Sequence, residues 1–222
     1  MHHIQRKILE KLLYAESLTY SQMRPTGVES NHFAYHLEQL VHGGVVNKKD
    51  KQYFLTPEGL AQVDRMSQEK MVDRVQPHIL TVIDITNAKG ETLLFKRAFQ
   101  PYIYKFGFPL GKTHLEETVE AAAARELQEK TGLDDIPLIQ RGIVYVHVKQ
   151  QGVTITKALC HVFSGRVKEA LTVKPLSHRG SCHWADVPTL PANDFMPGFL
   201  DIKKLLQNDK LSLFFAELTY EY

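Results

Sequence analysis

Cysteine is scarce in this chain and long apolar runs are missing, and both absences exclude classes of protein. Only Cys160 and Cys182 occur among 222 residues, which argues against a disulfide framework or a zinc site and favours two reduced thiols packed in the interior. No apolar run approaches the roughly 18 residues that a membrane helix needs. No charged and then apolar leader follows Met1, so we expect no signal peptide. A cytoplasmic protein with no membrane partner is the resulting expectation.

A strong charge of one sign is missing too. The 27 Lys and Arg residues nearly balance the 25 Asp and Glu residues, giving a formal net charge of +2. Such a balance does not by itself indicate a nucleic-acid partner. The length of 222 residues and the hydrophobic content of 43% are enough for one large core or two modest ones, so we expect a globular chain throughout.

What the chain does contain is the segment GKTHLEETVEAAAARELQEKTGL, from Gly111 to Leu133. Glu126, Glu129 and Lys130 stand at i, i+3 and i+4, so on a helix they project from the same side. Two carboxylates at this spacing suit Mg²⁺, which completes its octahedron with waters and substrate phosphates. The run of four alanines at 121–124 favours helix and lets it lie close to a sheet.

This segment resembles the Nudix box, in which a glycine, five residues, a glutamate and seven residues precede Arg-Glu-apolar-x-Glu-Glu-x-Gly-apolar. The positions that match are Gly111, Glu117, Arg125, Glu126, Leu127, Glu129, Gly132 and Leu133. The preceding YKFGFPLG supplies the aromatic and proline lead-in that is typical of the family. The resemblance implies an α/β (α+β) fold, a Nudix-like α/β/α sandwich with a mixed sheet.

The resemblance also implies roles for individual residues. In the family, water attacks a nucleoside diphosphate linked to another group, and metal ions neutralise the developing charge. The implied catalytic set is Glu126, Glu129, Arg125 and Glu117, of which Arg125 and Glu117 brace the loop. The implied ligands of Mg²⁺ (or Mn²⁺) are the backbone carbonyl of Gly111 with Glu126 and Glu129. Arg97 follows a strand where the family often contacts phosphate, and an ordinary surface arginine is the alternative.

Lys130 departs from the family pattern, because it stands where the family has its last box glutamate. A like-charge contact at about 4 Å costs roughly 1 kcal/mol in water and about four times as much at an effective dielectric constant of 20. We therefore expect metal binding to be weakened or absent. The ammonium group of Lys130 would instead hold a diphosphate without activating water, or it would pair with Glu126 four positions earlier.

A second departure lies in the stretch TVKPLSHRGSCHW, residues 172–184, which contains no Asp or Glu. Many family members carry a further carboxylate before the tryptophan. His178 and His183 are the obvious substitutes, but neutral imidazole is a poor ligand for Mg²⁺. We expect these two histidines to serve surface or loop packing.

The first 70 residues predict three helices followed by a two-stranded hairpin. Apolar residues recur at helical spacing over 5–15, a short helix opens at 17–20, and a third helix runs over 30–41. After Gly43-Gly44, VVNKKDKQYFLT reads as two extended runs around a basic turn, and a helix through Leu60, Val63 and Met66 follows Pro57. This order resembles the winged helix-turn-helix of bacterial transcriptional regulators.

The resemblance implies double-stranded DNA as a partner, with the third helix in the major groove and the basic turn against phosphates. The implied DNA-binding residues are Ser30, Asn31, His32, Tyr35, His36, Lys48, Lys49 and Lys51. A winged helix used for protein contact or dimerisation is the alternative. A homodimer would suit the DNA hypothesis, since two copies read two half-sites, and the sequence leaves the oligomeric state open.

The pattern changes at Pro77, where extended runs begin. We expect a winged helix-turn-helix domain at residues 1–70, a linker at 71–77 and a Nudix domain at 78–222. Strands are expected over 79–86, 92–98, 141–149 and 154–164, with a final helix from about Pro197. The tail LSLFFAELTYEY reads as an added edge strand or an intersubunit strand.

Two functional classes compete for this sequence. In the first, the protein is a transcriptional regulator whose Nudix domain binds a nucleotide-type metabolite with weak or no hydrolysis. In the second, it is a working Mg²⁺-dependent pyrophosphohydrolase with an appended module. The missing box glutamate at Lys130 favours the first, and the identity of the ligand and of the DNA target stays open.

Overall fold

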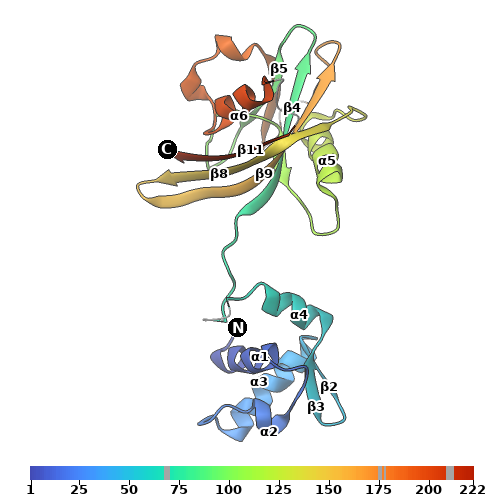
Figure 1. The fold of residues 1–222 in the computed structure, drawn as a ribbon, viewed down its shortest axis with the longest axis vertical. Helices are drawn as coiled ribbons and strands as arrows, with labels where there is room; N and C mark the ends of the chain where they lie inside the picture. Colours follow the sequence, from blue (N-terminus) through green and yellow to red (C-terminus); the bar gives the residue numbers. More distant parts are fainter. Residues whose placement is uncertain (68–70, 175–176, 178, 209–212) are drawn as a thin grey trace. The chain divides into compact units, whose positions relative to one another are not determined.

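The chain forms two units, Met1–Gln76 and Pro77–Tyr222 (Figure 1). The computed structural model describes residues 1–67, 71–174, 177, 179–208 and 213–222. Each unit has a hydrophobic core of its own. Within these ranges, no helix combines the length and the apolar content that crossing a membrane requires.

The first unit packs helices against a small antiparallel sheet. Its helices are α1 (His3–Leu13), α2 (Tyr20–Met23), α3 (Ser30–His42) and α4 (Pro57–Asp64), and its strands are β1 (Leu18–Thr19), β2 (Val46–Lys49) and β3 (Gln52–Leu55). The strand order is β1-β3-β2. The apolar stripes of α1 and α3 supply most of the core, through Ile4, Ile8, Leu9, Leu12, Phe33, Leu37 and Leu40.

Local sequence sets the ends of these elements. The side chain of Thr19 accepts a hydrogen bond from the backbone N–H of Gln22 and so caps α2, a role in which threonine is favoured. Asp50 and Lys51 have φ values of 48° and 68°, which makes the tight turn between β2 and β3. Two details differ from the prediction: β1 is an additional short strand, and α4 ends at Asp64 before reaching Met66.

The end of the first unit folds back on its core. Met66 forms an isolated bridge with Asp73. Met66 and Met71 are both buried in the core of this unit. Burial of these two apolar side chains explains why the chain turns here instead of extending the helix.

The second unit is built on a mixed sheet. Its strands are β4 (His78–Asn87), β5 (Thr92–Arg97), β6 (Phe106–Gly107), β7 (Leu110–Lys112), β8 (Ile139–Gln150), β9 (Val153–Val167), β10 (Gly180–Ala185) and β11 (Phe214–Glu221). The main strand order is β10-β5-β4-β9-β8-β11, while β6 pairs with β5 and β7 with β4. Because β4 and β9 run parallel, as do β8 and β11, the sheet is mixed. The predicted mixed α+β fold is confirmed.

Two helices cover opposite faces of this sheet (Figure 1). The two helices are α5 (Val119–Thr131) and α6 (Phe199–Leu206). Alternate residues of β4 point to opposite sides of the sheet. On one side Ile83 and Ile85 pack with Leu127 of α5, and on the other side Val82 packs with Ile202 of α6. Two short 3₁₀ turns, at 187–189 and 192–194, precede α6. The layers therefore run helix, sheet, helix.

A buried ion pair joins α6 to the central strand. The ammonium group of Lys203 lies 2.8 and 2.9 Å from the two carboxylate oxygens of Asp84. Burial raises the pKa of Asp84, and Lys203 partly offsets the rise. Removing either charge would leave the other buried without its counter-ion, which is costly, so this pair fixes where α6 lies on the sheet.

The cysteines and the C-terminal strand occupy the expected kinds of place. Cys160 and Cys182 are free and buried, in the cores on opposite sides of the sheet. β11 is an added edge strand that pairs in parallel with β8. The β8 and β9 strands extend beyond the predicted bounds, and β10 is a strand that the sequence did not predict.

Candidate functional site

The centre of the candidate site is α5 and the loop that leads into it. Thr118 caps the helix by accepting a hydrogen bond from the backbone N–H of Ala121. Gly132 ends the helix in the left-handed conformation, with φ of 78°, which glycine adopts without steric cost. Ala122 and Ala123 are fully buried, so the helix lies close against the sheet, as the alanine run predicts.

Both carboxylate oxygens of Glu126 are occupied by cationic side chains. Oε1 accepts a hydrogen bond from Nη1 of Arg125 at 2.8 Å, and Oε2 accepts one from Nζ of Lys130 at 2.7 Å. Glu126 is only 6% exposed, so both contacts are shielded from water. A buried carboxylate that already serves two cations is a weak candidate for binding a third.

Lys130 is held on its other sides as well. Its Nζ lies 5.8 Å from the centre of the Phe95 ring, within the range of a cation–π contact. Its backbone carbonyl accepts a hydrogen bond from the thiol of Cys182 at 3.5 Å. Burial raises the pKa of Cys182 to about 11, while the nearby charge of Lys130 acts in the opposite direction. The ammonium group is thus directed into the site instead of into bulk water.

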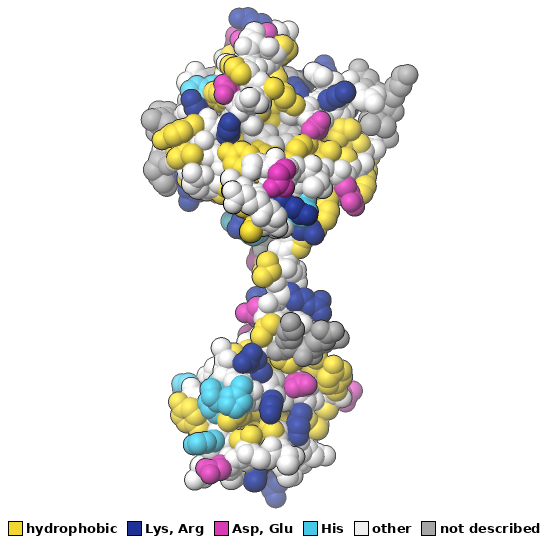
Figure 2. All heavy atoms as spheres, turned by 90° about the vertical axis from the view of Figure 1, so that its left-hand side faces the viewer, with side chains coloured by type: hydrophobic (Ala, Val, Ile, Leu, Met, Phe, Trp, Pro, Cys, Tyr) yellow, Lys and Arg dark blue, Asp and Glu magenta, His cyan; other side chains and the backbone are white. Residues whose placement is uncertain are grey.

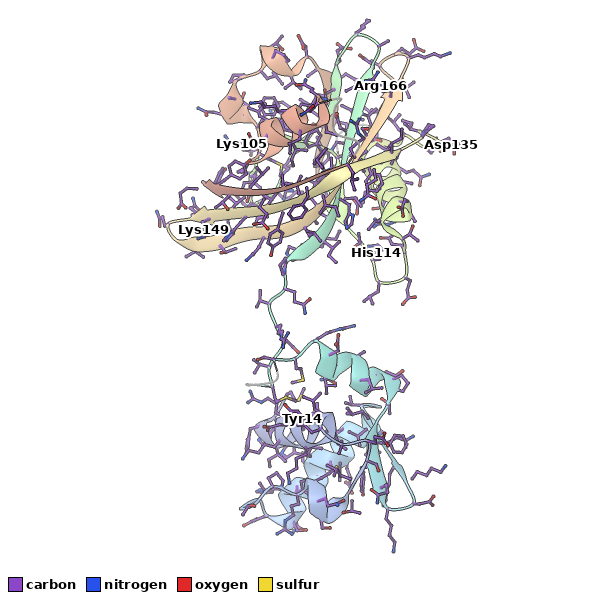
Figure 3. The ribbon with its side chains drawn as sticks, in the orientation of Figure 1. Tyr14, Lys105, His114, Asp135, Lys149 and Arg166 are labelled. Atoms are coloured by element: carbon purple, nitrogen blue, oxygen red, sulfur yellow. The ribbon has the colours of Figure 1, made fainter. Side chains whose placement is uncertain are left out.

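Arg125 braces the loop before the helix. Its guanidinium donates two hydrogen bonds to Glu117, from Nε at 2.9 Å and from Nη2 at 2.7 Å, and one to the carbonyl of Lys112 at 3.0 Å. Glu117 also accepts a hydrogen bond from the backbone N–H of His114 at 2.6 Å, in the loop labelled in Figure 3. The hydrogen bonds from Arg125 lower the pKa of Glu117 to about 2.

Glu129 differs from Glu126 in its exposure and in its ion pairs. Its side chain is 51% exposed, and its one ion pair is a longer contact of 3.5 Å with Nη1 of Arg125. Among the ion pairs of the described residues, none joins Glu129 to Lys130. Glu129 is therefore the box carboxylate that is most accessible to a ligand or metal.

Gly111 brings the sheet and the helix into contact. A Cβ atom placed on Gly111 would lie 1.8 Å from the carboxyl carbon of Glu126 and 2.0 Å from each of its oxygens. Only glycine therefore leaves room for this carboxylate against β7. The close approach places the backbone of Gly111 beside Glu126.

These residues do not fit a divalent metal ion as they stand. No group of three or more His, Cys, Asp or Glu suited to a metal occurs in the part of the chain that the structure describes. Arg125 and Lys130 neutralise the charge of Glu126. The ammonium group of Lys130 occupies the carboxylate oxygen to which a metal ion would bind. A metal at this place would require Lys130 to leave Glu126.

Of the two histidines considered as substitutes, the structure describes only His183. Nε2 of His183 is hydrogen-bonded to Oγ of Ser181 at 2.6 Å, and its ring lies edge-on to Phe106 at 6.3 Å. His183 thus serves surface packing on β10. His178 lies outside the described residues.

Arg97 ends β5 without a carboxylate partner among the ion pairs of the described residues. Its guanidinium carbon lies 3.9 Å from the centre of the Phe99 ring. Its Nε is buried and has no hydrogen-bond partner in the structure, and burial lowers the pKa of Arg97. A half-buried guanidinium with an unused donor is suited to an anionic ligand group.

An apolar pocket on the α6 side of the sheet was not predicted from the sequence. Tyr102, Phe108 and Leu110 form one wall and Met196 and Phe199 form another, with further lining from β4, β8 and β9. The hydroxyl of Tyr102 donates to that of Thr156 at 2.7 Å. The lead-in YKFGFPLG was the available signal, because its Gly107, Phe108 and Leu110 line this pocket just before Gly111.

In the first unit, the predicted DNA-binding residues lie on α3 and on the β2–β3 turn. Asn31, His32 and Tyr35 are exposed, His36 is half-buried, and Ser30 shares a hydrogen bond with the hydroxyl of Tyr20. Lys48, Lys49 and Lys51 are all exposed, and Lys48 lies over the ring of Tyr53 at 5.4 Å. Figure 2 shows histidine side chains gathered on one face of this unit.

Comparison with known proteins covers the second unit. A family model of the NUDIX domain matches residues 77–201. No curated protein matches the chain. Residues 1–76 lie outside the range that the family model matches.

Several solved structures share the fold. A MutT NUDIX hydrolase from Burkholderia pseudomallei is 22% identical, with a TM-score of 0.51 over 60% of this chain and 99% of that chain. The NUDIX domain of Shewanella oneidensis NrtR complexed with ADP ribose is 15% identical, with a TM-score of 0.50 over 60% and 88%. A NUDIX hydrolase from Nitrosomonas europaea is 20% identical, with a TM-score of 0.50 over 61% and 92%.

The match extends over more than half of the chain and includes the whole segment from Gly111 to Leu133. Nudix hydrolases generally use a divalent metal, which makes the contacts of Lys130 a departure within a shared fold. By the family model and the fold together, this chain belongs to the Nudix family.

Proposed function

We propose that the second unit binds a nucleoside-diphosphate-linked metabolite with weak or no hydrolysis, and that the protein is a transcriptional regulator. The observation that carries the proposal is the 2.7 Å contact between Nζ of Lys130 and Oε2 of Glu126. A cation supplied by the chain occupies the carboxylate that a hydrolase needs for its metal. Without a metal, water beside the diphosphate is not activated.

Lys130 would bind the diphosphate electrostatically. An ammonium group carries three donors and one positive charge, so it attracts phosphate oxygens as a point charge. Arg97 adds a guanidinium with an unused buried donor. The two cations would anchor an anionic ligand and leave its bonds intact.

The group linked to the diphosphate would enter the apolar pocket beside Tyr102 and Phe108. Pockets of this kind bind aromatic and ring-shaped ligand parts through apolar contact, with a few polar groups fixing orientation. The Tyr102 and Thr156 hydroxyls supply such polar groups. The NUDIX domain of Shewanella oneidensis NrtR, which shares the fold, was crystallised with ADP ribose, and this supports a nucleotide-type ligand here.

The first unit would bind double-stranded DNA as a winged helix-turn-helix over residues 1–70, with the linker at 71–77. Three helices followed by the β2–β3 hairpin agree with that arrangement. The exposed polar residues of α3 would read base edges, and the exposed lysines of the turn would contact phosphates. Two copies would read two half-sites, which favours a homodimer.

Ligand binding and turnover should be measured on the same sample. Titration calorimetry with ADP-ribose, NAD⁺ and a nucleoside triphosphate, with and without Mg²⁺ or Mn²⁺, is expected to show binding of at least one of them. Phosphorus NMR of the same mixtures should show no conversion over hours. Lys130→Ala should weaken binding, and Lys89→Ala, on an exposed turn away from α5, is the charge-matched control.

DNA binding needs a separate measurement. A duplex from the region upstream of the chain's own gene should bind in a salt-dependent manner. Replacing Lys48, Lys49 and Lys51 by alanine should flatten the plot of log K against log salt by up to about 0.9 per lysine. Replacing the exposed Lys89, Lys157 and Lys168 of the second unit should not. A slope that is equal in both variants would reject the DNA assignment.

An active Mg²⁺-dependent pyrophosphohydrolase is the second candidate, and the exposure of Glu129 favours it. If Lys130 swings away when substrate arrives, Glu126 and Glu129 would become ligands for one metal, and the Arg125–Glu117 brace is already in place. Turnover at ordinary enzymic rates that is abolished by Glu129→Gln would establish this function and reject the sensor.

A further inference from the structure

His2 begins α1 as its capping residue. Nδ1 of His2 accepts a hydrogen bond from the backbone N–H of Ile4 at 3.3 Å, and the backbone N–H of His2 donates to Oε1 of Gln5 at 3.0 Å. A ring nitrogen accepts a hydrogen bond only while it carries no proton. The cap therefore requires the neutral form of His2.

The ring of His2 also stacks on α3. It lies parallel to the ring of His36, with centroids 3.9 Å apart and an interplanar angle of 9°. The ring of His3 lies 4.2 Å from that of His2, and the ring of Tyr35 lies edge-on to His36 at 5.2 Å. The stack thus joins the start of α1 to the exposed face of α3.

Among the described residues, the charged groups that act on the two rings are basic. Arg6, His3 and the amino group of Met1 act on His2 from α1, and His3 and His32 act on His36. Desolvation, followed by repulsion from these groups, lowers the pKa of both His2 and His36. The surroundings therefore favour two neutral rings.

We propose that the His2–His36 stack is a proton-operated contact: it covers one face of the His36 ring while both imidazoles are neutral, and it opens when either gains a proton. Protonation of His2 turns its cap acceptor into a donor and places a positive charge at the positive end of the helix dipole. It also brings a cation face to face with His36. Opening removes all of these conflicts at once.

The sign of the pH effect follows from the direction of the shift. A histidine whose pKa is lower in the folded state than in the unfolded state stabilises the fold above its unfolded pKa, about 6.5. That contribution is lost as the pH falls through the folded value. The contact is closed at neutral pH and opens under mild acid.

The consequence for DNA rests on the proposed function of the first unit. His36 lies among the residues assigned to DNA, one face of its ring being covered by His2. Once released and charged, its imidazolium would contact a phosphate or a guanine edge. Acidification would then strengthen DNA binding through this residue.

The contact can be tested on the full chain by NMR titration of its imidazole resonances. Both pKa values should lie below about 6.5, and replacing one ring should raise that of the other toward this value. His2→Asn removes the ring but keeps a side-chain oxygen for the cap, and His36→Gln removes the other ring. His42→Gln, exposed at the far end of α3, is the matched control and should leave both values unchanged.

The same proteins should be titrated with a duplex from upstream of the chain's own gene at fixed ionic strength. When the pH is lowered from 7.5 to 5.5, the affinity of the wild type for the duplex should rise roughly three- to tenfold more than that of His36→Gln. The slope of log K against log salt should also steepen in the wild type, by up to about 0.9 for the added phosphate contact. A pKa of His36 that does not respond to His2→Asn overturns the contact. Equal pH dependence in wild type and His36→Gln overturns its link to DNA. Absence of duplex binding at every pH rejects the proposed function, while the NMR result still decides the contact.

Discussion

The two ends of the Nudix segment differ in how their carboxylates are used. Glu117, in the loop, accepts hydrogen bonds from one guanidinium and one backbone N–H, and these contacts hold the loop to α5. Glu126, on the helix, is paired with two cations at once. The loop end is therefore built as a brace, and the helix end carries its own positive charge where a metal would otherwise be held.

The structure of this segment and its chemistry therefore depend on different residues. The brace needs only Arg125 and Glu117, so the loop and helix keep their form whatever residue stands at position 130. The chemistry depends on the charge beside Glu126 and Glu129, and one ammonium group changes it. On the proposed function, this Nudix fold would bind a diphosphate without binding a metal ion.

Reversing the charge of Lys130 should have the largest effect on this comparison. Lys130→Glu removes the repulsion between the ammonium group and a bound metal ion. That repulsion is about 4 kcal/mol at an effective dielectric constant of 20, so its loss corresponds to roughly a thousandfold gain in affinity for Mn²⁺ or Mg²⁺. Titration calorimetry with each ion measures the change. Lys89→Glu makes the same charge reversal on an exposed turn and should gain no such affinity. A Lys130→Glu protein that still binds no ion would show that the site lacks more than this one carboxylate.

Adding a side chain at Gly111 should have the next largest effect. The new Cβ of Gly111→Ala would meet the Glu126 carboxylate at 1.8 Å, so the carboxylate must move and lose its contacts, at a cost of about 1 to 3 kcal/mol. Urea unfolding measures the loss. In a Glu126→Ala background the same substitution should cost much less, and the double-mutant cycle isolates this contact. Additive effects would show that the crowding lies elsewhere.

The sequence predicted the local parts of this site and missed the distant ones. The α5 helix and the i to i+4 pairing of Lys130 with Glu126 follow from residues close together in the chain, and both are found. The pairing of Lys203 with Asp84 joins residues 119 positions apart, and the stack of His2 on His36 joins two helices. Neither leaves a periodic pattern, because such contacts depend on how the elements pack and not on local spacing.

The apolar pocket was missed for the same reason. Its walls come from β4, β8, β9, α6 and the segment from Tyr102 to Leu110. The sequence of each of these elements, taken alone, has the pattern of an ordinary hydrophobic core. Only the sheet order brings them together. The lead-in before Gly111 gave the one local hint, which pointed to the family and not to a cavity.

Breaking the brace should loosen the loop before α5. Arg125→Leu removes the donors to Glu117 and to the carbonyl of Lys112, so amide hydrogen exchange over residues 113–118 should speed up by about tenfold or more. Arg166→Leu, an exposed arginine on β9 (Figure 3), is the matched control. Unchanged exchange in Arg125→Leu would mean that packing alone holds the loop.

Mild acid should have the smallest effect on the brace. The folded-state pKa of Glu117 lies at about 2, below the unfolded value near 4.3. The ionised carboxylate therefore stabilises the fold fully above the unfolded pKa. This contribution is lost only as the pH falls through about 2. The carboxyl resonance of Glu117 should therefore stay unshifted from neutral pH down to about pH 3.5, a range in which an ordinary glutamate titrates. In Arg125→Leu the same resonance should move near its ordinary pKa. If it titrates there in the wild type too, the hydrogen bonds from Arg125 do not hold in solution, and the loop and helix ends of the segment would no longer differ as the structure indicates.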